Sequence, residues 1–530
     1  MTSTTKLALF YLIIGAVLAT GLRAQGTYTA ASCNESDVSA AVAAEQAKAA
    51  DGDIISIPSG TCTWTGNTGI TINATNSLTI QGAGAQYATT GGASTAGSDS
   101  TVIIDNIDHA ASNSPTFNFN NTAAGKSYRL TGIFIQQNGS SYVNNNGVVG
   151  VSGNSSAVRI DHCHFYGTHG DSFVATVGNV TGVADHDFFQ AQAGLLFFFF
   201  EFQNGSSWKG ANNDGLGDAS FADASHWGTS QFFYAEDSYF HYGDYVTDCE
   251  DGGRFVIRYS TIVDAALAWH GTAGSQGRGC RAGEIYGNTF TYPDSGPSNA
   301  AVAVNSGTVL VWGNTVSNNT NVVLTGDLRD SNGTYSEPAP PNGWGYCGTA
   351  QTGSVSSWDQ NTDSSGYACL DQPGRGAGDL ITGTAFPNIV NSVLGGQAWP
   401  REAIDPIYIW DNTYNLTGAG KIWGNLTGAL VTDNRDVYQQ FGTYGESGSF
   451  SGAKGIGQGT YSQISSSCTA GPGGNTPGVG FWATDQSTLY VCNPTNTWKA
   501  YYTPYTYPHP LTGGSSDPLV PPTNVKAVGH

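Results

Sequence analysis

The sequence predicts an all-β protein whose strands wind into a solenoid, and three observations support this. The chain of 530 residues contains 72 glycines, and only 11% of its residues are charged. Glycine supplies turn geometry and weakens helices, so this composition favours short strands joined by many turns. An eight-residue segment also recurs along the chain, with equivalent positions at Ala235, Ile257, Ile285 and Val311 separated by 22, 28 and 26 residues. A period in this range is typical of solenoids.

The recurring segment has a fixed chemical pattern. It occurs as VRIDHCHF (158–165), FYAEDSYF (233–240), FVIRYSTI (255–262), GEIYGNTF (283–290), VLVWGNTV (309–316) and IYIWDNTY (407–414). The third residue is apolar or small, and the sixth is small or polar: Cys163, Ser238, Ser260, Asn288, Asn314 and Asn412. We expect parallel coils stacked at about 4.8 Å, with the third residues inside. The sixth residues should form an internal ladder of hydrogen bonds, with Cys163 as a buried free thiol.

The first elements of the mature chain are a helix followed by short strands. The segment SDVSAAVAAEQAKAADGD (36–53) is rich in alanine, and Ser36 or Asp37 is a suitable helix N-cap. Strands are predicted in DIISIPSGTCTW (53–64), SLTIQGAG (77–84) and STVIID (100–105). Since the end of a solenoid exposes unpaired strand edges, the helix is expected to act as the N-terminal cap.

These N-terminal segments carry a resemblance to a known superfamily. The helix, DGDIISIPSGTCTWTG (51–66) and LTIQGAG (78–84) together resemble the opening of right-handed parallel β-helix proteins of the pectin-lyase-like superfamily. The resemblance covers roughly residues 33–425 and implies a right-handed parallel β-helix solenoid. That fold serves lyases, hydrolases, esterases, phage tailspikes and adhesins, so it does not imply one activity. VRIDHCHF is similar to the Asp-His strand of pectate lyases, but the arginine signature of those enzymes and the motifs of polygalacturonases are not found.

Three regions are predicted. Residues 1–24 have the features of a secretory signal peptide: Lys6, the apolar run 7–19 and a cleavage point near Ala24. Residues 25–425 form the β-helix with its N-terminal cap, and residues 426–530 form an aromatic and glycine-rich C-terminal cap and tail. The aromatic part (487–511) is expected to be a strand pair laid against the coil, or alternatively a patch that stacks on sugars. No later stretch is apolar over enough residues to span a bilayer, which predicts a secreted protein, extracellular or periplasmic.

The nine cysteines fit an oxidising compartment. Proximity in sequence suggests the pairs Cys33–Cys62, Cys249–Cys280, Cys347–Cys369 and Cys468–Cys492, although spacing alone does not fix connectivity. The net charge of −21 excludes nucleic acid as a partner, because that binding relies on lysine and arginine. The charge also disfavours unaided binding of an acidic polymer, unless a divalent cation reverses the local sign.

The repeat predicts one chemically mixed outer face. If third residues point inward, second and fourth residues point outward. The fourth-residue column is Asp161, Glu236, Arg258, Tyr286, Trp312 and Trp410, and the second-residue column includes Arg159, Tyr234, Glu284 and Tyr408. Acids, arginines and aromatics on one face are typical of a carbohydrate groove. The loops TDCEDGGRF (247–255) and AWHGTAGSQGRGCR (268–281) add further charged groups, and a Cys249–Cys280 bond would tie them together.

These residues predict an enzyme that degrades an extracellular polysaccharide, with a calcium-assisted lyase preferred. In that interpretation Ca²⁺ is held by oxygen ligands. The candidates are Glu236, Asp237, Asp248, Glu250 and Asp251. The catalytic candidates are Arg258, Arg281, His270 and Glu284, with the arginine roles resting on the resemblance to lyases. The substrate-binding candidates are Tyr286, Trp312, Trp410, Arg254 and Arg278.

Other interpretations of the same residues remain open. A metal-independent glycoside hydrolase would use two carboxylates, with Glu236, Asp248, Glu250, Asp251 and Glu284 as candidates. A non-catalytic carbohydrate-binding or adhesive protein would use the aromatic face alone. Glu236 beside Arg258, or Glu284 beside Arg258, is also explained by a cross-strand ion pair that only stabilises the coil.

Overall fold

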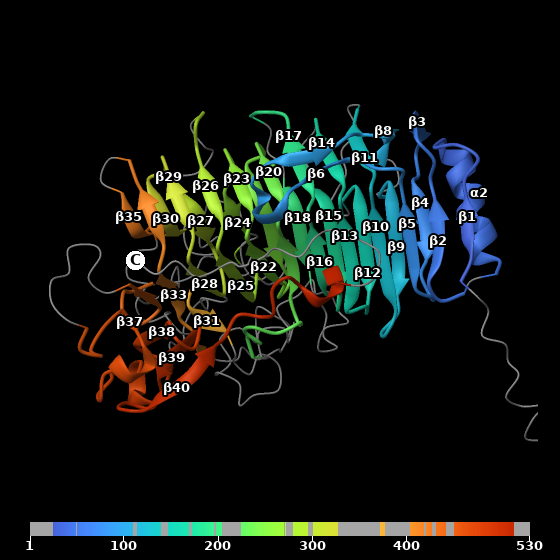
Figure 1. Cartoon of the computed structure of the whole chain (residues 1–530). Coiled ribbons are helices and arrows are strands. Elements are labelled where there is room, and N and C mark those ends of the chain that lie inside the picture. Colours follow the sequence, from blue (N-terminus) through green and yellow to red (C-terminus); the bar gives the residue numbers. More distant parts are fainter. Residues whose placement is uncertain are drawn as a thin grey trace, which may run out of the picture.

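The computed structural model shows a parallel β-helix with a small additional sheet at its C-terminal side (Figure 1). The structure describes residues 25–48, 50–109, 114–138, 147–168, 172–194, 198–203, 224–269, 271, 279–294, 300–326, 372–376, 403–417, 420–426, 431–440 and 450–513. The predicted signal peptide lies outside these residues. None of the helices within them has the length and apolar character that a membrane span requires.

Three long parallel sheets form the walls of the coil in the described ranges. Sheet A contains β1 (Thr27–Thr29), β2 (Asp53–Ser56), β5 (Leu78–Gln81), β10 (Ser127–Thr131), β13 (Ala157–Asp161), β16 (Gly182–Asp185), β19 (Phe233–Glu236), β22 (Arg254–Arg258), β25 (Ala282–Tyr286), β28 (Thr308–Trp312), β33 (Ile407–Trp410) and β36 (Val437–Gln439). Sheet B contains β3 (Gly60–Gly66), β8 (Thr101–Ile107), β11 (Phe134–Gln137), β14 (His164–Gly167), β17 (Phe188–Ala191), β20 (Tyr239–His241), β23 (Thr261–Val263), β26 (Thr289–Thr291), β29 (Thr315–Ser317) and β34 (Thr413–Asn415). Sheet C contains β4 (Ile70–Asn73), β9 (Phe117–Thr122), β12 (Val149–Gly153), β15 (Ser172–Gly178), β18 (Phe198–Gln203) and β21 (Tyr245–Glu250).

Smaller sheets complete the fold. Beyond β21 the third wall continues as β24 (Leu267–Ala268), β27 (Ala300–Val304), β30 (Asn321–Thr325) and β35 (Lys421–Asn425). Two antiparallel pairs are β6 (Gln86–Ala88) with β7 (Thr95–Gly97), and β31 (Arg375–Gly376) with β32 (Ala403–Ile404). The C-terminal sheet contains β37 (Ile456–Gly459), β38 (Gly480–Ala483), β39 (Thr488–Cys492) and β40 (Trp498–Tyr502). The short 3-10 helices are η1 (Thr90–Gly92), η5 (Tyr461–Gln463), η6 (Pro472–Gly474) and η7 (Pro510–Gly513).

The register of sheet A confirms the repeat predicted from the sequence. The third residues stack directly, with Ala235 paired to Ile257, then to Ile285, Val311 and Ile409 on successive strands. All of them are buried in the core of the coil. The aligned segments did not include two neighbouring coils. These are residues 128–135, whose Leu130 pairs with Ile160, and residues 182–189, whose Ala184 pairs with Ala235. The observed β structure confirms the predicted all-β parallel β-helix.

The turn from sheet A to sheet B contains the predicted polar ladder. Its first residue has a positive φ in successive coils: 52° at His162, 57° at His186, 52° at Asp237 and 51° at Tyr259. The next residue points inward. Asn314 Nδ2 donates to the carbonyl of Ile285 and to Asn412 Oδ1, at 2.9 Å each. Neighbouring rungs repeat this arrangement through Asn288, Ser260 and Ser238.

The Asn314 rung provides a test of this ladder. Asn314→Ala is expected to lower the free energy of unfolding by about 1–3 kcal/mol, because buried groups on two neighbouring coils lose their partner. Urea denaturation monitored by circular dichroism would measure the change. Thr315→Ala, at the next and exposed position, should change stability by less than about 0.5 kcal/mol. If the two substitutions lowered the free energy of unfolding equally, the ladder would not contribute to stability as stated.

The predicted N-terminal helix is α2 (Glu35–Gln46), shorter than expected. It contacts β1, β2, β3 and β4 through a face that includes Val38 and Val42 (Figure 1). The N-cap position is Asn34 rather than Ser36 or Asp37, and Asn34 makes no side-chain capping bond. Asp37 lies in the first turn, where it accepts a hydrogen bond from Ser32 Oγ at 2.5 Å.

Three of the predicted disulfides are present. They join Cys33 to Cys62, Cys249 to Cys280, and Cys468 to Cys492. Cys347 and Cys369 lie outside the described residues. Cys163 is a free thiol with no exposed surface, which confirms the inward position predicted for it. Burial raises the pKa of this thiol well above its ordinary value, so it is a packing residue rather than a reactive one.

Candidate functional site

The outer face of sheet A carries the predicted mixture of side chains, but the chain itself covers it. Residues 498–513, here called the C-terminal segment, run from β40 across the middle of this face to β16 (Figure 1). The Arg258 side chain is completely buried beneath the C-terminal segment. Its guanidinium donates to the carbonyls of Tyr505 at 3.0 Å and Thr506 at 2.9 Å. Glu236 accepts from the same guanidinium at 2.7 Å and from the backbone N–H of His509 at 2.8 Å.

The aromatic column is covered in the same way. Tyr286, Trp312 and Trp410 stack on successive coils, with ring centroids 4.6 and 5.7 Å apart. Trp482 and Tyr502 of the C-terminal sheet pack against Trp312 and Trp410. These contacts build a hydrophobic cluster in which Tyr286 and Trp410 are buried. The face predicted to bind substrate is therefore packed against protein rather than open to a polymer.

Glu284 also lies under this cover. It accepts hydrogen bonds from the backbone N–H of Gly228 at 2.8 Å and from the Tyr502 hydroxyl at 3.0 Å. Burial raises the pKa of Glu284 to about 7, and the two hydrogen bonds only partly oppose it. The environment explains this raised pKa without a catalytic role.

Glu284 predicts a pH-dependent stability. A carboxyl that binds its proton more tightly in the folded chain contributes stability below its unfolded pKa, and that contribution is lost as the pH rises. Here the loss falls between pH 4.5 and about 7. Glu284→Gln removes the titration, so its stability relative to wild type is expected to improve by up to about 3 kcal/mol from pH 4 to pH 8. Thermal unfolding of both proteins at the two pH values measures this difference. The same difference in stability between the two proteins at pH 4 and at pH 8 would contradict the raised pKa of Glu284.

The other arginine candidates are structural or undescribed. Arg281 is buried and donates to Asp405 Oδ2 at 2.9 Å. Arg254 is buried, and its guanidinium donates to the carbonyls of Gly252 and Ala224. His270 and Arg278 lie outside the described residues, so their predicted roles stay predictions.

The five carboxylates predicted to bind calcium lie at two places. Glu236 ends β19 of sheet A and Asp237 follows it. Asp237 Oδ1 accepts from the backbone N–H of Gly91 at 2.7 Å and from the Tyr507 hydroxyl at 2.8 Å. Asp248 and Glu250 lie on β21 of sheet C, and Asp251 follows that strand. Within the described part of the chain, no three histidine, cysteine or acidic side chains are grouped so that they could hold a metal ion. The predicted five-ligand set does not fit a single site.

A different carboxylate group lies on sheet C. Glu201 on β18 is the register partner of Asp248 on β21, and Gln203 is the partner of Glu250. Gln203 Nε2 lies 2.5 Å from Glu201 Oε1 and 2.7 Å from Glu250 Oε1, so it joins the two carboxylates. Ser172 Oγ donates to the other oxygen of Glu201 at 3.2 Å. All three acidic residues are buried, with 4–6% of their surface exposed, and we call them the sheet C carboxylates.

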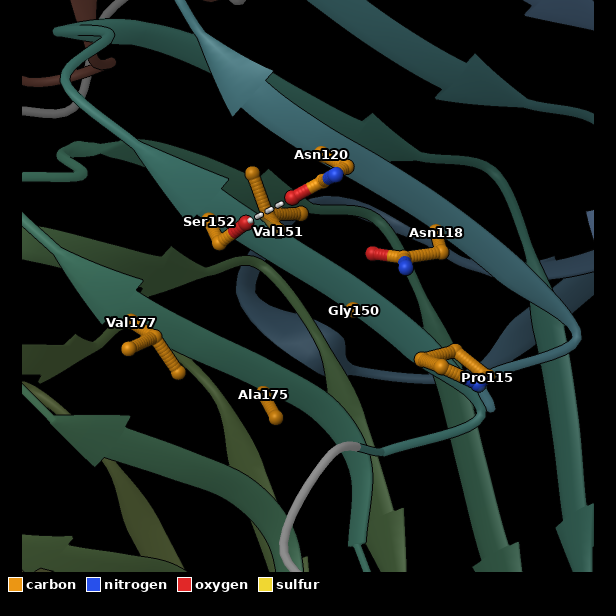
Figure 2. A pocket seen from close by; sticks show the side chains of 8 residues that line it. All are labelled: Pro115, Asn118, Asn120, Gly150, Val151, Ser152, Ala175 and Val177. Atoms are coloured by element: carbon orange, nitrogen blue, oxygen red, sulfur yellow. Dashed lines mark hydrogen bonds between the residues drawn. The ribbon is translucent and has the colours of Figure 1, made fainter. Parts of the chain in front are cut away.

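A pocket adjoins this group on the same sheet. It has a volume of about 190 Å³ and is lined by Pro115, Asn118, Asn120, Gly150, Val151, Ser152, Ala175 and Val177. Figure 2 shows Asn118 and Asn120 on one strand, with Ser152 of the next strand hydrogen-bonded to Asn120 at 3.1 Å. Ala175 and Val177 pair with Glu201 and Gln203 on the next strand. The pocket and the carboxylates are therefore consecutive parts of one face.

Asp248 and Glu250 were candidates from the sequence, but Glu201 and Gln203 were not. Both follow the phenylalanine run 197–200. The available signal was a single acid and a single amide alternating with apolar residues in FFEFQ (199–203), since an isolated charge in a buried strand needs a partner or a function. No protein-family model, curated protein or solved structure matches this chain.

Proposed function

We propose that this protein is a secreted enzyme of the pectin-lyase-like superfamily that hydrolyses an extracellular polysaccharide at the sheet C carboxylates. The proposal rests on the two hydrogen bonds that Gln203 donates, one to Glu201 and one to Glu250, beside a pocket on the same face of sheet C. Three disulfides support an oxidising, extracellular compartment. Arg258 is paired with Glu236 and Arg281 with Asp405, and because these ion pairs hold the arginines in their protonated form, we favour a carboxylate mechanism over one that uses them as bases.

The spacing of the two glutamates supports a retaining mechanism. Because both accept from one amide nitrogen, at 2.5 and 2.7 Å, their bridged oxygens are at most about 5.2 Å apart. This limit is shorter than the ~6.5–9.5 Å that the intervening water of inverting glycosidases requires, so a retaining mechanism is preferred. Glu201 is assigned as the nucleophile, because hydrogen bonds from Gln203 and Ser172 fix the orientation of its carboxylate. Glu250 is assigned as the acid and base.

The reaction then takes two steps. Glu201 attacks the anomeric carbon and forms a glycosyl ester, while Glu250 gives its proton to the departing glycosidic oxygen. Glu250 next removes a proton from water, whose oxygen attacks the anomeric carbon and releases Glu201 as a carboxylate. Asp248, opposite Glu201 on the neighbouring strand, is placed to stabilise positive charge that develops on the sugar ring.

A calcium-assisted lyase is the second candidate. The resemblance of VRIDHCHF (158–165) to the Asp-His strand of pectate lyases favours it. No reaction step is assigned through the ion, because the described residues do not form a three-ligand group.

Product chemistry tests the proposal. The purified mature protein would be incubated with neutral and acidic polysaccharides, in Ca²⁺ and in EDTA. Reducing ends and the ultraviolet absorbance of unsaturated sugars would both be followed. New reducing ends without absorbance, unaffected by EDTA, are expected. Calcium-dependent absorbance would replace the hydrolase with the lyase, and inactivity on every polymer would favour a non-catalytic binding protein.

A further inference from the structure

We infer that the pocket across β9, β12 and β15 binds a sugar unit of an uncharged polysaccharide and feeds that chain to the sheet C carboxylates. This inference rests on the proposed function and specifies its substrate class. It begins from the order of side chains across sheet C. Because alternate residues of each strand point outward, one outer column runs Asn118, Gly150, Ala175, Glu201 and Asp248.

The change along this column separates two chemical regions. All eight residues that line the pocket are uncharged. The next two strands carry Glu201, Asp248 and Glu250. A substrate lying across the coils therefore meets neutral groups first and carboxylates afterwards. This arrangement matches a glycan whose non-reacting units are held at one side of the bond to be cleaved.

The neutral region has the chemistry that sugars require. The amides of Asn118 and Asn120 and the hydroxyl of Ser152 can donate and accept hydrogen bonds, as sugar hydroxyls do. Ala175, Val177 and Pro115 provide apolar surface for the C–H groups of a ring. Gly150 lies between Asn118 and Ala175 and contributes no side chain to the pocket (Figure 2).

The same chemistry disfavours an acidic polymer. A uronate in this pocket finds no positive group among the eight lining residues, and the neighbouring unit faces Glu201 and Asp248. Like charges at such positions weaken binding, and the net charge of −21 adds a repulsive field. An uncharged glycan is repelled neither by the nearby carboxylates nor by the net negative charge.

Binding measurements with a Glu250→Gln full-length protein test the inference separately from catalysis. Calorimetric titrations would compare neutral oligosaccharides from xylan, mannan and β-glucan with acidic ones from polygalacturonate and alginate, in EDTA. At least one neutral series is expected to bind tenfold more tightly than either acidic series. Ser152→Trp should weaken that binding at least tenfold by filling the pocket. Thr315→Trp, on the exposed face of sheet B, is the matched control and should leave it unchanged.

The outcomes distinguish the inference from the proposed function. Neutral binding with no cleavage by the wild-type protein would support the inference and contradict the hydrolase. Cleavage of acidic polymers alone would support the hydrolase and overturn the inference, as would equal binding by the Ser152→Trp and Thr315→Trp proteins. If Ser152→Trp does not fold, the double variant Asn118→Ala, Asn120→Ala replaces it, and unchanged binding by that variant overturns the inference.

Discussion

Arg258→Ala is expected to lower the free energy of unfolding by about 3–5 kcal/mol. The substitution leaves the Glu236 carboxylate buried without the guanidinium that lies 2.7 Å from it. It also removes the donors to the carbonyls of Tyr505 and Thr506. Chemical denaturation would measure the loss. Limited proteolysis should show earlier cleavage within the C-terminal segment, because that segment is held to sheet A through Arg258.

Two further variants separate this effect from a general loss of charge. Lys499→Ala, at an exposed position of β40, should change stability by less than about 0.5 kcal/mol. Glu236→Gln in the Arg258→Ala protein should recover part of the lost stability, because it replaces the buried charge with a neutral group that still accepts from His509. Equal stability of Arg258→Ala and wild type would show that the C-terminal segment does not depend on this arginine.

The coil was predictable because its determinants repeat. Each third residue stacks on its equivalent, so an apolar or small residue recurs there, as Ile285 and Val311 do. The sixth residue is small or polar, and Asn288 and Asn314 form consecutive rungs of the ladder. The coil at 182–189 has the same pattern, with Ala184 third, Asp187 sixth and Phe189 eighth, although it was not among the aligned segments. The sequence analysis therefore predicted the outer columns of sheet A correctly, since alternation follows once the inner residues are known.

The cover over sheet A could not be predicted in the same way. Arg258 and Tyr505 are 247 residues apart in sequence, and no repeat relates them. An aromatic and charged outer column has the same composition whether a glycan or the chain's own end packs on it. Glu201 was missed for a related reason. Its closeness to Glu250 depends on the register of β18 with β21. That register cannot be deduced from the sequence, because the number of residues between equivalent strands varies from coil to coil.

Glu201→Gln is expected to lower kcat on the cleaved polysaccharide at least about 10³-fold, because the amide cannot form the glycosyl ester. Glu250→Gln should lower it about 10²–10⁴-fold on the polysaccharide, because the departing oxygen loses its proton donor. On an aryl glycoside whose phenolate leaves readily, the Glu250 variant should still complete the first step and show a burst of phenolate. The Glu201 variant should show no burst on either substrate. Stopped-flow absorbance measures this difference directly.

The kcat of Glu284→Gln, compared with those of the Glu201 and Glu250 variants, shows whether the active site lies on sheet A or on sheet C. Glu284 was a catalytic candidate by sequence, but it lies under Tyr502 on sheet A, away from the sheet C carboxylates. Its isosteric replacement is therefore expected to retain kcat within about threefold at the pH of the assay, since each tenfold loss would require about 1.4 kcal/mol of transition-state stabilisation from this residue. A large loss in Glu284→Gln together with normal rates in the Glu201 and Glu250 variants would move the active site to sheet A. It would also require the C-terminal segment to leave that face before substrate binds.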